Sequence, residues 1–194
     1  AAATRGFLIL SNAAEYALSS VDDKLLLNID DFSSQLEKLL KAGKEICIFG
    51  FTYILYKNVV EKLLNNKVSF QLPPNSKIVH IGGWKKLESE KVSKSKFLRD
   101  LSATFKISED CVVDFYGFTE QMGLLYANCG LNPKTTPAYS EIIVRDFQTL
   151  QPVTDGNEGL IQILTPLPNS YPGISILTED VGKIISRGNL NGRN

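Results

Sequence analysis

Short apolar runs alternate with amphipathic segments in the first 125 residues of the chain. The runs have the length and character of buried strands, and they lie at 6–10, 45–49, 77–81 and 111–116. Three segments carry apolar residues at helical spacing, and they begin near Asp30, Leu55 and Ser93. We expect Asp30 and Asp31 to cap the first of these helices, which ends at Gly43. The alternation predicts an α/β fold with a parallel or mixed sheet and flanking helices.

Glycines follow three of the predicted strands. They are Gly50, Gly82–Gly83 and Gly117. In parallel α/β sheets, ligands bind at the carboxyl ends of the strands, and glycine lets the backbone approach a ligand closely. A tight structural turn would explain any one of these glycines. Three of them at one edge of a sheet predict a cleft there.

The pattern changes near residue 125, beyond which the chain becomes β-rich. Strand-like runs separated by turns containing Pro, Gly, Asn or Asp lie at 141–145, 159–164, 174–177 and 183–185. The organisation predicted from this change is an α/β portion over 1–125, a β-rich subdomain over 126–187 and a polar tail over 188–194.

Composition and charge narrow the classes of function. Hydrophobic residues make up 43% of the 194 residues and charged residues 22%, as in an average globular protein. The 21 basic and 21 acidic residues balance, so we expect no nucleic-acid partner. A local basic excess between Lys77 and Lys106 fits a solvated helix face.

No apolar run reaches the roughly 20 residues of a membrane-spanning helix, and the N-terminus lacks the pattern of a signal peptide. We therefore expect a cytoplasmic protein without a membrane span.

The chain holds three cysteines, Cys47, Cys111 and Cys129, and a single histidine, His80. This set is too small for an ordinary structural zinc site and leaves little room for a Ser-His-Asp triad. Cys47 and Cys111 lie in apolar runs, so we expect both thiols in the core. His80 is either a hydrogen-bonded residue at a strand end or a neighbour of the turn at Gly82. Cys129 is either an incidental residue of a polar loop or an acyl-carrying thiol.

An aromatic ring, a hydroxyl and a carboxylate come together just after the run 111–116. Tyr116 can stack on a nucleobase, Thr119 can bond a phosphate oxygen and Glu120 can hold Mg²⁺. Alternatively, Thr119 caps a short helix whose N-terminus stabilises Glu120. Farther along, Asp180 follows a predicted strand, where it either accepts hydrogen bonds from ribose hydroxyls or belongs to a solvated acidic turn.

These residues resemble a family. Tyr116-Gly117-Phe118-Thr119-Glu120 resembles the Tyr-Gly-x-Thr-Glu motif of adenylate-forming enzymes, the acyl-CoA synthetase superfamily. Leu177-Thr178-Glu179-Asp180 resembles their later Thr-Gly-Asp motif, with Glu179 in place of glycine. From about Arg5 to Gly182 the chain is most similar to the acyl-protein synthetase branch, the fatty-acid-activating enzymes linked to bacterial luciferase. That similarity also includes Phe49-Gly50-Phe51-Thr52, His80-Ile81-Gly82-Gly83-Trp84-Lys85-Lys86 and Ser170-Tyr171-Pro172-Gly173.

The resemblance implies a reaction and a role for each matching residue. A fatty-acid carboxylate would attack the α-phosphorus of ATP with the help of Mg²⁺, and the resulting acyl-adenylate would pass its acyl group to a protein thiol. The implied fold is part of the large N-terminal domain of adenylate-forming enzymes. The implied roles are an adenine-bordering loop at Gly82, Gly83 and Trp84, adenine stacking by Tyr116 before Gly117, an α-phosphate contact at Thr119, Mg²⁺ binding by Glu120 and ribose binding by Asp180.

Parts of the family's pattern have no counterpart in this sequence. Nothing in residues 1–45 resembles the phosphate loop, and the C-terminal lid with its lysine and the acyl-accepting cysteine do not appear. We therefore expect a central fragment with little turnover in isolation, which self-associates or depends on missing enzyme segments. Its expected partners are a small carboxylic acid, ATP and an acyl-acceptor protein. The alternative is a non-catalytic module that binds nucleotide or another protein.

Overall fold

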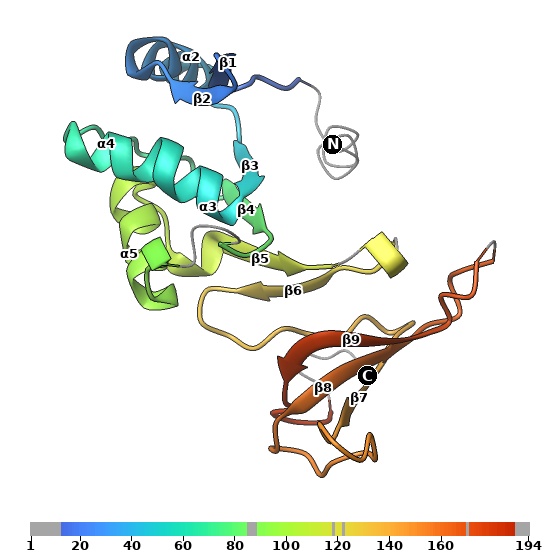
Figure 1. Cartoon of the computed structure of the whole chain (residues 1–194). Coiled ribbons are helices and arrows are strands. Elements are labelled where there is room, and N and C mark those ends of the chain that lie inside the picture. Colours follow the sequence, from blue (N-terminus) through green and yellow to red (C-terminus); the bar gives the residue numbers. More distant parts are fainter. Residues whose placement is uncertain (1–12, 85–88, 118, 122, 170, 189–194) are drawn as a thin grey trace. The chain divides into compact units, whose positions relative to one another are not determined.

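The chain divides into two compact units. The computed structural model describes residues 13–84, 89–117, 119–121, 123–169 and 171–188. The first unit comprises residues 1–114 and 129–131, and the second comprises 115–128 and 132–194. The labelled helices belong to the first unit, and β7, β8 and β9 belong to the second (Figure 1). The division between these units falls inside a strand, Val112–Tyr116, because residues 115–128 pack within the second unit, and the predicted organisation with a change near residue 125 stays a prediction.

Four strands form the main sheet, in the order β3 (Cys47–Phe51), β4 (Lys77–Ile81), β5 (Val112–Tyr116), β6 (Tyr126–Cys129). β3 and β4 are parallel, and Phe51 lies opposite Ile81 at the end of their ladder. The predicted α/β fold class is therefore confirmed, and β4 has the predicted bounds. The expectation that Gly50 follows a strand was wrong, because Gly50 pairs with His80 inside the ladder.

Helices of the first unit bury their apolar faces in one core. They are α2 (Ile29–Lys41), a second helix made of α3 (Thr52–Ile54), the π-helical segment η1 (Leu55–Val60) and α4 (Glu61–Asn65), and α5 (Lys94–Phe105). Helices were predicted in all three places, and the π-helical turn was not. Side chains of this core that are at most 1% exposed include Leu63, Ile78, Leu98, Leu101, Phe105 and Val112. Burial of such side chains is the main source of stability for this unit.

The N-terminus of α2 is capped by Asn28. Its side-chain oxygen accepts hydrogen bonds from the backbone N–H groups of Asp30, at 3.1 Å, and Asp31, at 3.3 Å. The prediction that Asp30 and Asp31 are the caps was therefore wrong by two to three residues. Both lie in the first turn of the helix, where a negative charge interacts favourably with the helix dipole. Gly43, with φ +64°, follows the C-cap residue as predicted.

An unpredicted hairpin precedes α2. β1 (Leu18–Val21) and β2 (Lys24–Leu27) pair in an antiparallel register, joined by Asp22 and Asp23, which both have positive φ. Most of its side chains are exposed, so the sequence lacks the alternating pattern that predicts a half-buried strand. The predicted strand at 6–10 lies outside the described residues.

The second unit is built on an antiparallel meander of β7 (Glu141–Arg145), β8 (Gly159–Leu164) and β9 (Ser175–Gly182). β7 and β8 have the predicted bounds. Only glycine fits at the start of β8, because a Cβ on Gly159 would lie 2.2 Å from the carbonyl oxygen of Arg145. Leu124, Tyr126 and Ile163 form the small core of this unit.

Two predictions for the end of the chain were wrong. Asp180 does not follow a strand but lies inside β9, which continues from the predicted run at 174–177 to Gly182. The predicted strand at 183–185 is not formed, because the β8–β9 ladder ends where Gly182 pairs with Gly159. β6 was not predicted.

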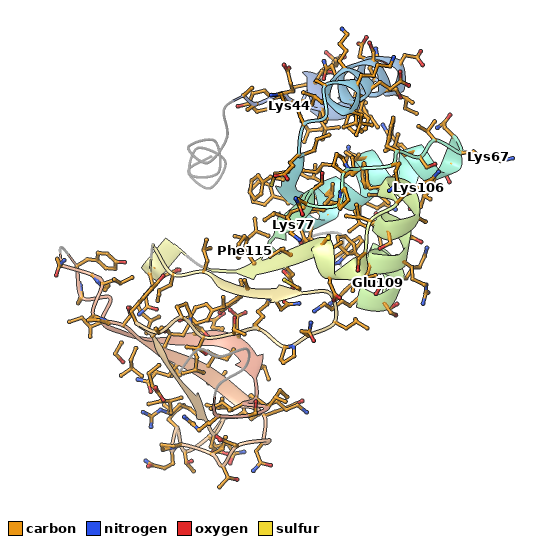
Figure 2. The ribbon with its side chains drawn as sticks, turned by 180° about the vertical axis from the view of Figure 1, so that it is seen from behind. Lys44, Lys67, Lys77, Lys106, Glu109 and Phe115 are labelled. Atoms are coloured by element: carbon orange, nitrogen blue, oxygen red, sulfur yellow. The ribbon has the colours of Figure 1, made fainter. Side chains whose placement is uncertain are left out.

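The exposure of two cysteines and of two lysines can be compared with the predictions. Cys47 is exposed as the first residue of β3, and Cys111 is partly exposed in the 3₁₀ turn η3 (Glu109–Cys111), so the expectation of core thiols was wrong. Lys77 and Lys106, which bound the basic stretch, are exposed (Figure 2), but Lys77 begins β4 and Lys106 follows α5, so neither lies on the predicted helix face. Among the described residues, no helix is long and apolar enough to cross a membrane.

The cap of α2 can be tested by mutation. We expect Asn28→Ala to lower the free energy of unfolding by about 1 kcal/mol, because two N–H groups lose their acceptor. Asp30→Ala removes only a charge near the helix dipole, so it should cost less, about 0.5 kcal/mol. Urea unfolding followed by circular dichroism measures both. Equal losses for the two variants, or a larger loss for Asp30→Ala, would contradict the assignment of the cap.

Candidate functional site

The glycine turn after β4 lies in the first unit. Gly82, with φ +81°, and Gly83 are exposed, whereas Trp84 is only 6% exposed. The indole packs edge-on against Tyr56, with 5.5 Å between ring centroids, and belongs to the core. A ligand bound at this turn would therefore contact the backbone of the two glycines. Trp84, packed in the core, holds the end of the turn in place. The adenine-bordering role of Gly82, Gly83 and Trp84 stays a prediction, and Lys85 and Lys86 lie outside the described residues.

His80 is a hydrogen-bonded residue of β4, in agreement with one of its two predicted roles. Its Nδ1 lies 2.9 Å from the hydroxyl of Thr52 and 3.8 Å from a carboxylate oxygen of Asp114. The imidazole also packs on Phe97, with 4.8 Å between ring centroids. The Thr52 hydroxyl also donates a hydrogen bond to the carbonyl oxygen of Gly82. His80 is thus connected to the glycine turn through Thr52.

Tyr116 and Asp180 meet in the second unit. The phenol of Tyr116, at the end of β5, donates a hydrogen bond of 2.5 Å to Oδ2 of Asp180 in β9, 64 residues along the chain. Burial of the ring, together with this bond, raises the pKa of the Tyr116 phenol. The Tyr116 ring also lies beside Tyr126, with centroids 5.9 Å apart. The fold therefore places an oriented aromatic ring and a carboxylate side by side.

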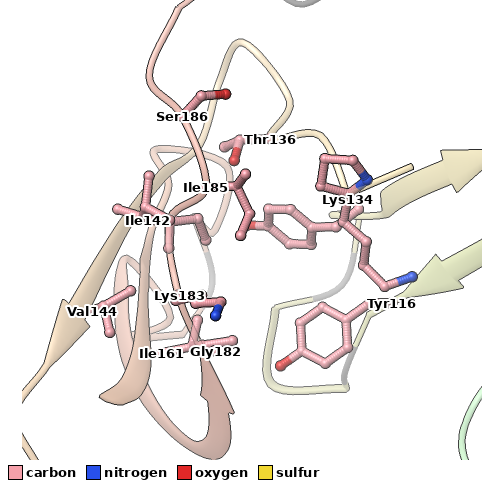
Figure 3. Close-up of a pocket in the computed structure, with 13 residues that line it drawn as sticks. Tyr116, Lys134, Thr136, Ile142, Val144, Ile161, Gly182, Lys183, Ile185 and Ser186 are labelled. Atoms are coloured by element: carbon pink, nitrogen blue, oxygen red, sulfur yellow. The ribbon is translucent and has the colours of Figure 1, made fainter. Parts of the chain in front are cut away.

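A pocket of about 280 Å³ opens beside Tyr116, wholly within the second unit (Figure 3). Its walls combine two tyrosine rings with isoleucine and valine side chains of the meander. Two lysines and two hydroxyl groups add polar atoms. The lining residues are Tyr116, Tyr126, Pro133, Lys134, Thr136, Ile142, Val144, Ile161 and the segment 182–186. An apolar recess with a few polar groups is the usual form of a small-molecule site.

The short 3₁₀ helix η4 (Thr119–Gln121) follows Gly117 and carries the next predicted residues. Glu120 is exposed, and the side chain of Thr119 lies outside what the structure describes. Gln121 is 1% exposed, and its amide nitrogen donates a hydrogen bond of 2.6 Å to the carbonyl oxygen of Gly173. This buried glutamine anchors the turn that presents Glu120. Sequence reasoning assigned it no role, because nothing in the local pattern marks it as buried.

The structure does not gather a metal cluster around Glu120. Among the described residues, no group of three or more His, Cys, Asp or Glu side chains could hold a metal ion. Glu120 as a single Mg²⁺ ligand therefore stays a prediction. Cys129 is exposed at the end of β6, so its expected place in a polar loop was wrong.

The Tyr116–Asp180 bond predicts a pH dependence. The folded chain binds the phenol proton more tightly than the unfolded chain, whose tyrosines titrate near 10.0. The contribution of Tyr116 to the free energy of unfolding is therefore complete below about pH 10 and is lost as the pH rises further. We expect the stability difference between the unaltered chain and Tyr116→Phe to shrink over that range. Urea unfolding at a series of pH values measures it, and a constant difference would contradict the assignment.

The anchoring role of Gln121 can be tested separately. Gln121→Leu keeps the size of the side chain but leaves the carbonyl oxygen of Gly173 without this donor. We expect the free energy of unfolding to fall by about 1–3 kcal/mol, the usual cost of a buried unpaired polar group. Gln148→Leu, at an exposed position, is the matched control and should change it by less than about 0.5 kcal/mol. Equal effects of the two substitutions in chemical denaturation would rule out the anchor.

Comparison with known proteins identifies the family of the chain. The family described as "Acyl-protein synthetase, LuxE" matches residues 1–194. Two relatives are long-chain-fatty-acid–luciferin-component ligases: that of Aliivibrio fischeri is 24% identical over 156 residues, and that of Vibrio harveyi is 23% identical over 150 residues. These matches cover 78% and 77% of this chain, but the chain spans only 40% and 39% of the relatives.

Solved structures of adenylate-forming enzymes share the fold. A 2-hydroxyisobutyryl-CoA ligase in complex with 2-HIB-AMP and CoA has a TM-score of 0.53 at 16% identity, over 77% of this chain and 31% of that one. McyG A-PCP complexed with phenylalanyl-adenylate has a TM-score of 0.50 at 20% identity, over 78% and 30%. At such identities the likeness shows the fold alone, that of N-terminal domains of adenylate-forming enzymes. Since the family match extends over all 194 residues, the chain belongs to the acyl-protein synthetase family.

Proposed function

We propose that this chain is the nucleotide-binding part of an ATP-dependent ligase that activates a fatty acid as its acyl-adenylate. The single observation that supports the proposal most is the contact between Tyr116 and Asp180, because the family resemblance assigns these residues to the adenine ring and the ribose of one nucleotide. Two groups that serve one ligand have to lie close together. These two residues do, although they are far apart in the sequence.

The geometry of the pair suits that task. A carboxylate accepts several hydrogen bonds, so Asp180 can bond ribose hydroxyls while it still holds the phenol of Tyr116. The bond restrains rotation of the tyrosine ring, which lowers the entropy cost of stacking on a base. The apolar, aromatic-walled pocket beside Tyr116 offers the kind of surface on which adenine binds.

Mg²⁺ would be held by Glu120. This ion keeps several water ligands and in nucleotide sites takes one or two carboxylates together with phosphate oxygens, so a single exposed glutamate fits it. When bound, the ion neutralises charge on the phosphates. Thr119, one residue earlier, would contact the α-phosphate, and Gln121 keeps this turn in place through its bond to Gly173.

The proposed reaction has two steps. In the first step, a carboxylate oxygen of the fatty acid bonds to the α-phosphorus of ATP. The bond between the α-phosphorus and the oxygen that bridges to the β-phosphorus breaks, and pyrophosphate leaves. A thiolate of an acceptor protein then attacks the acyl carbon, a thioester forms and AMP leaves. Positioning and charge neutralisation carry most of such a reaction, so it needs no strong base from this chain.

Nucleotide binding tests the proposal directly. We expect the chain to bind a non-hydrolysable acyl-adenylate mimic in calorimetry, and Asp180→Ala to weaken binding about tenfold or more, because a charged hydrogen-bond acceptor is lost. Glu179→Ala is the matched control, since Glu179 is the neighbouring carboxylate of β9 and is likewise exposed, whereas the phenol of Tyr116 bonds Asp180. Glu120→Ala should leave the mimic bound but remove the effect of Mg²⁺ on ATP affinity.

Circular dichroism of each variant separates loss of binding from loss of folding. Equal affinity of Asp180→Ala and Glu179→Ala for the mimic would contradict the ribose assignment. A folded chain that binds neither ATP, AMP nor the mimic would contradict nucleotide binding altogether and favour a protein-interaction module.

A further inference from the structure

The side chain of Thr52 connects the ends of two neighbouring strands. Thr52 directly follows β3, and its hydroxyl lies 2.9 Å from Nδ1 of His80 in β4. The same hydroxyl donates a hydrogen bond to the carbonyl oxygen of Gly82. Thr52 is 8% exposed and His80 is 6% exposed, so their contact is shielded from water, and the contact with the exposed Gly82 is partly buried. A shielded hydrogen bond costs more to break than an exposed one.

The single hydrogen of the Thr52 hydroxyl determines whether Nδ1 of His80 is protonated. A threonine hydroxyl has one hydrogen, and Thr52 gives it to the carbonyl oxygen of Gly82, which can only accept. Nδ1 of His80 must then carry a hydrogen and donate it to the Thr52 oxygen. The carboxylate of Asp114, 3.8 Å from Nδ1, favours a hydrogen on that nitrogen. The order of donation is therefore His80 to Thr52 to Gly82.

This chain of hydrogen bonds begins inside the β3–β4 ladder, where His80 pairs with Gly50, and ends just beyond it. The ladder's last pair is Phe51 and Ile81, so Thr52 and Gly82 are the next residues on each strand. The Thr52 hydroxyl is not part of the β3–β4 ladder, and it reaches the turn through the carbonyl oxygen of Gly82. Gly82 is held through its carbonyl, and Trp84 is held by the core two residues later. The exposed Gly82–Gly83 backbone is thus fixed at both ends.

We infer that Thr52 and His80 are positioning residues that hold the Gly82–Gly83 turn in the conformation that binds nucleotide. The inference rests on the proposed function, because it assigns these two residues to the support of the turn that borders the adenine. Neither residue needs to touch the ligand. Without the Thr52 hydroxyl, the Gly82 carbonyl loses this buried donor and the turn can reorient.

A pair of substitutions at Thr52 tests the inference. Thr52→Val keeps the shape of the side chain and removes the hydroxyl, whereas Thr52→Ser keeps the hydroxyl. We expect Thr52→Val to bind the non-hydrolysable acyl-adenylate mimic about tenfold more weakly, and Thr52→Ser to bind within about threefold of the unaltered chain. Thr104→Val is the matched control, because Thr104 is also buried and donates to a carbonyl, that of Asp100 in α5.

Trp84 supplies a second measurement that a loss of stability alone would not change. It is the only tryptophan of the chain, and it follows the turn directly. We expect acrylamide to quench its fluorescence more strongly in folded Thr52→Val than in Thr52→Ser or Thr104→Val. If Thr52→Val fails to fold, His80→Leu and His80→Asn provide the same comparison, because asparagine keeps a nitrogen donor near the position of Nδ1.

The outcomes separate this inference from the proposed function. If the unaltered chain binds the mimic and Thr52→Val binds it equally well, the positioning role is wrong and the proposed function stands. If Thr104→Val weakens binding as much as Thr52→Val, or if quenching of Trp84 does not change, positioning of the turn is likewise wrong. If the folded, unaltered chain does not bind the mimic, the proposed function fails and the inference fails with it.

Discussion

The hydrogen bond between the Tyr116 phenol and the Asp180 carboxylate is the interaction on which the geometry of the candidate site depends. It connects the end of β5 to β9 within the second unit, and it orients the ring that forms one wall of the pocket. A short bond to a charged acceptor is stronger than a neutral one. The bond also means that the Asp180 carboxylate already accepts a hydrogen bond before any ligand binds. This does not prevent Asp180 from binding a ligand, because a carboxylate has enough lone pairs to accept further hydrogen bonds.

The parts of the fold that the sequence predicts well are those in which burial decides the local pattern. β4, β7 and β8 have the predicted bounds, and α5 begins after Ser93 as expected, because each combines an apolar run or face with a clear boundary residue. The exposed β1–β2 hairpin has no such pattern and was missed. Cys47 shows the converse error: an apolar neighbourhood in the sequence does not bury the first residue of a strand.

The candidate site is predictable only in part, for a related physical reason. Tyr116, Glu120 and Asp180 belong to recognisable motifs, so the sequence names them, but it does not show that Tyr116 and Asp180 touch. Gln121 and Thr52 were not assigned a role, because each is a single polar residue whose burial comes from contacts distant in sequence. Only tertiary structure reveals what such residues hold. The position of Asp180 was also predicted incorrectly from the sequence, since β9 extends five residues beyond the predicted run and ends at Gly182.

Buried polar side chains that support the candidate site residues change how family membership should be interpreted. A motif supplies chemical groups, but each unit holds its groups with a buried polar side chain from another part of the chain: Thr52 bonds Gly82 in the first unit, and Gln121 bonds Gly173 in the second. Such contacts are directional, and a hydrogen-bonded group that loses its partner in the interior is destabilised by more than the bond contributes. Under the proposed function, a sequence can therefore keep Tyr116, Glu120 and Asp180 and still lose nucleotide binding through a change at Thr52 or Gln121. Under the proposed function, retention of these supports is a better indicator of nucleotide binding than retention of Tyr116, Glu120 and Asp180 alone.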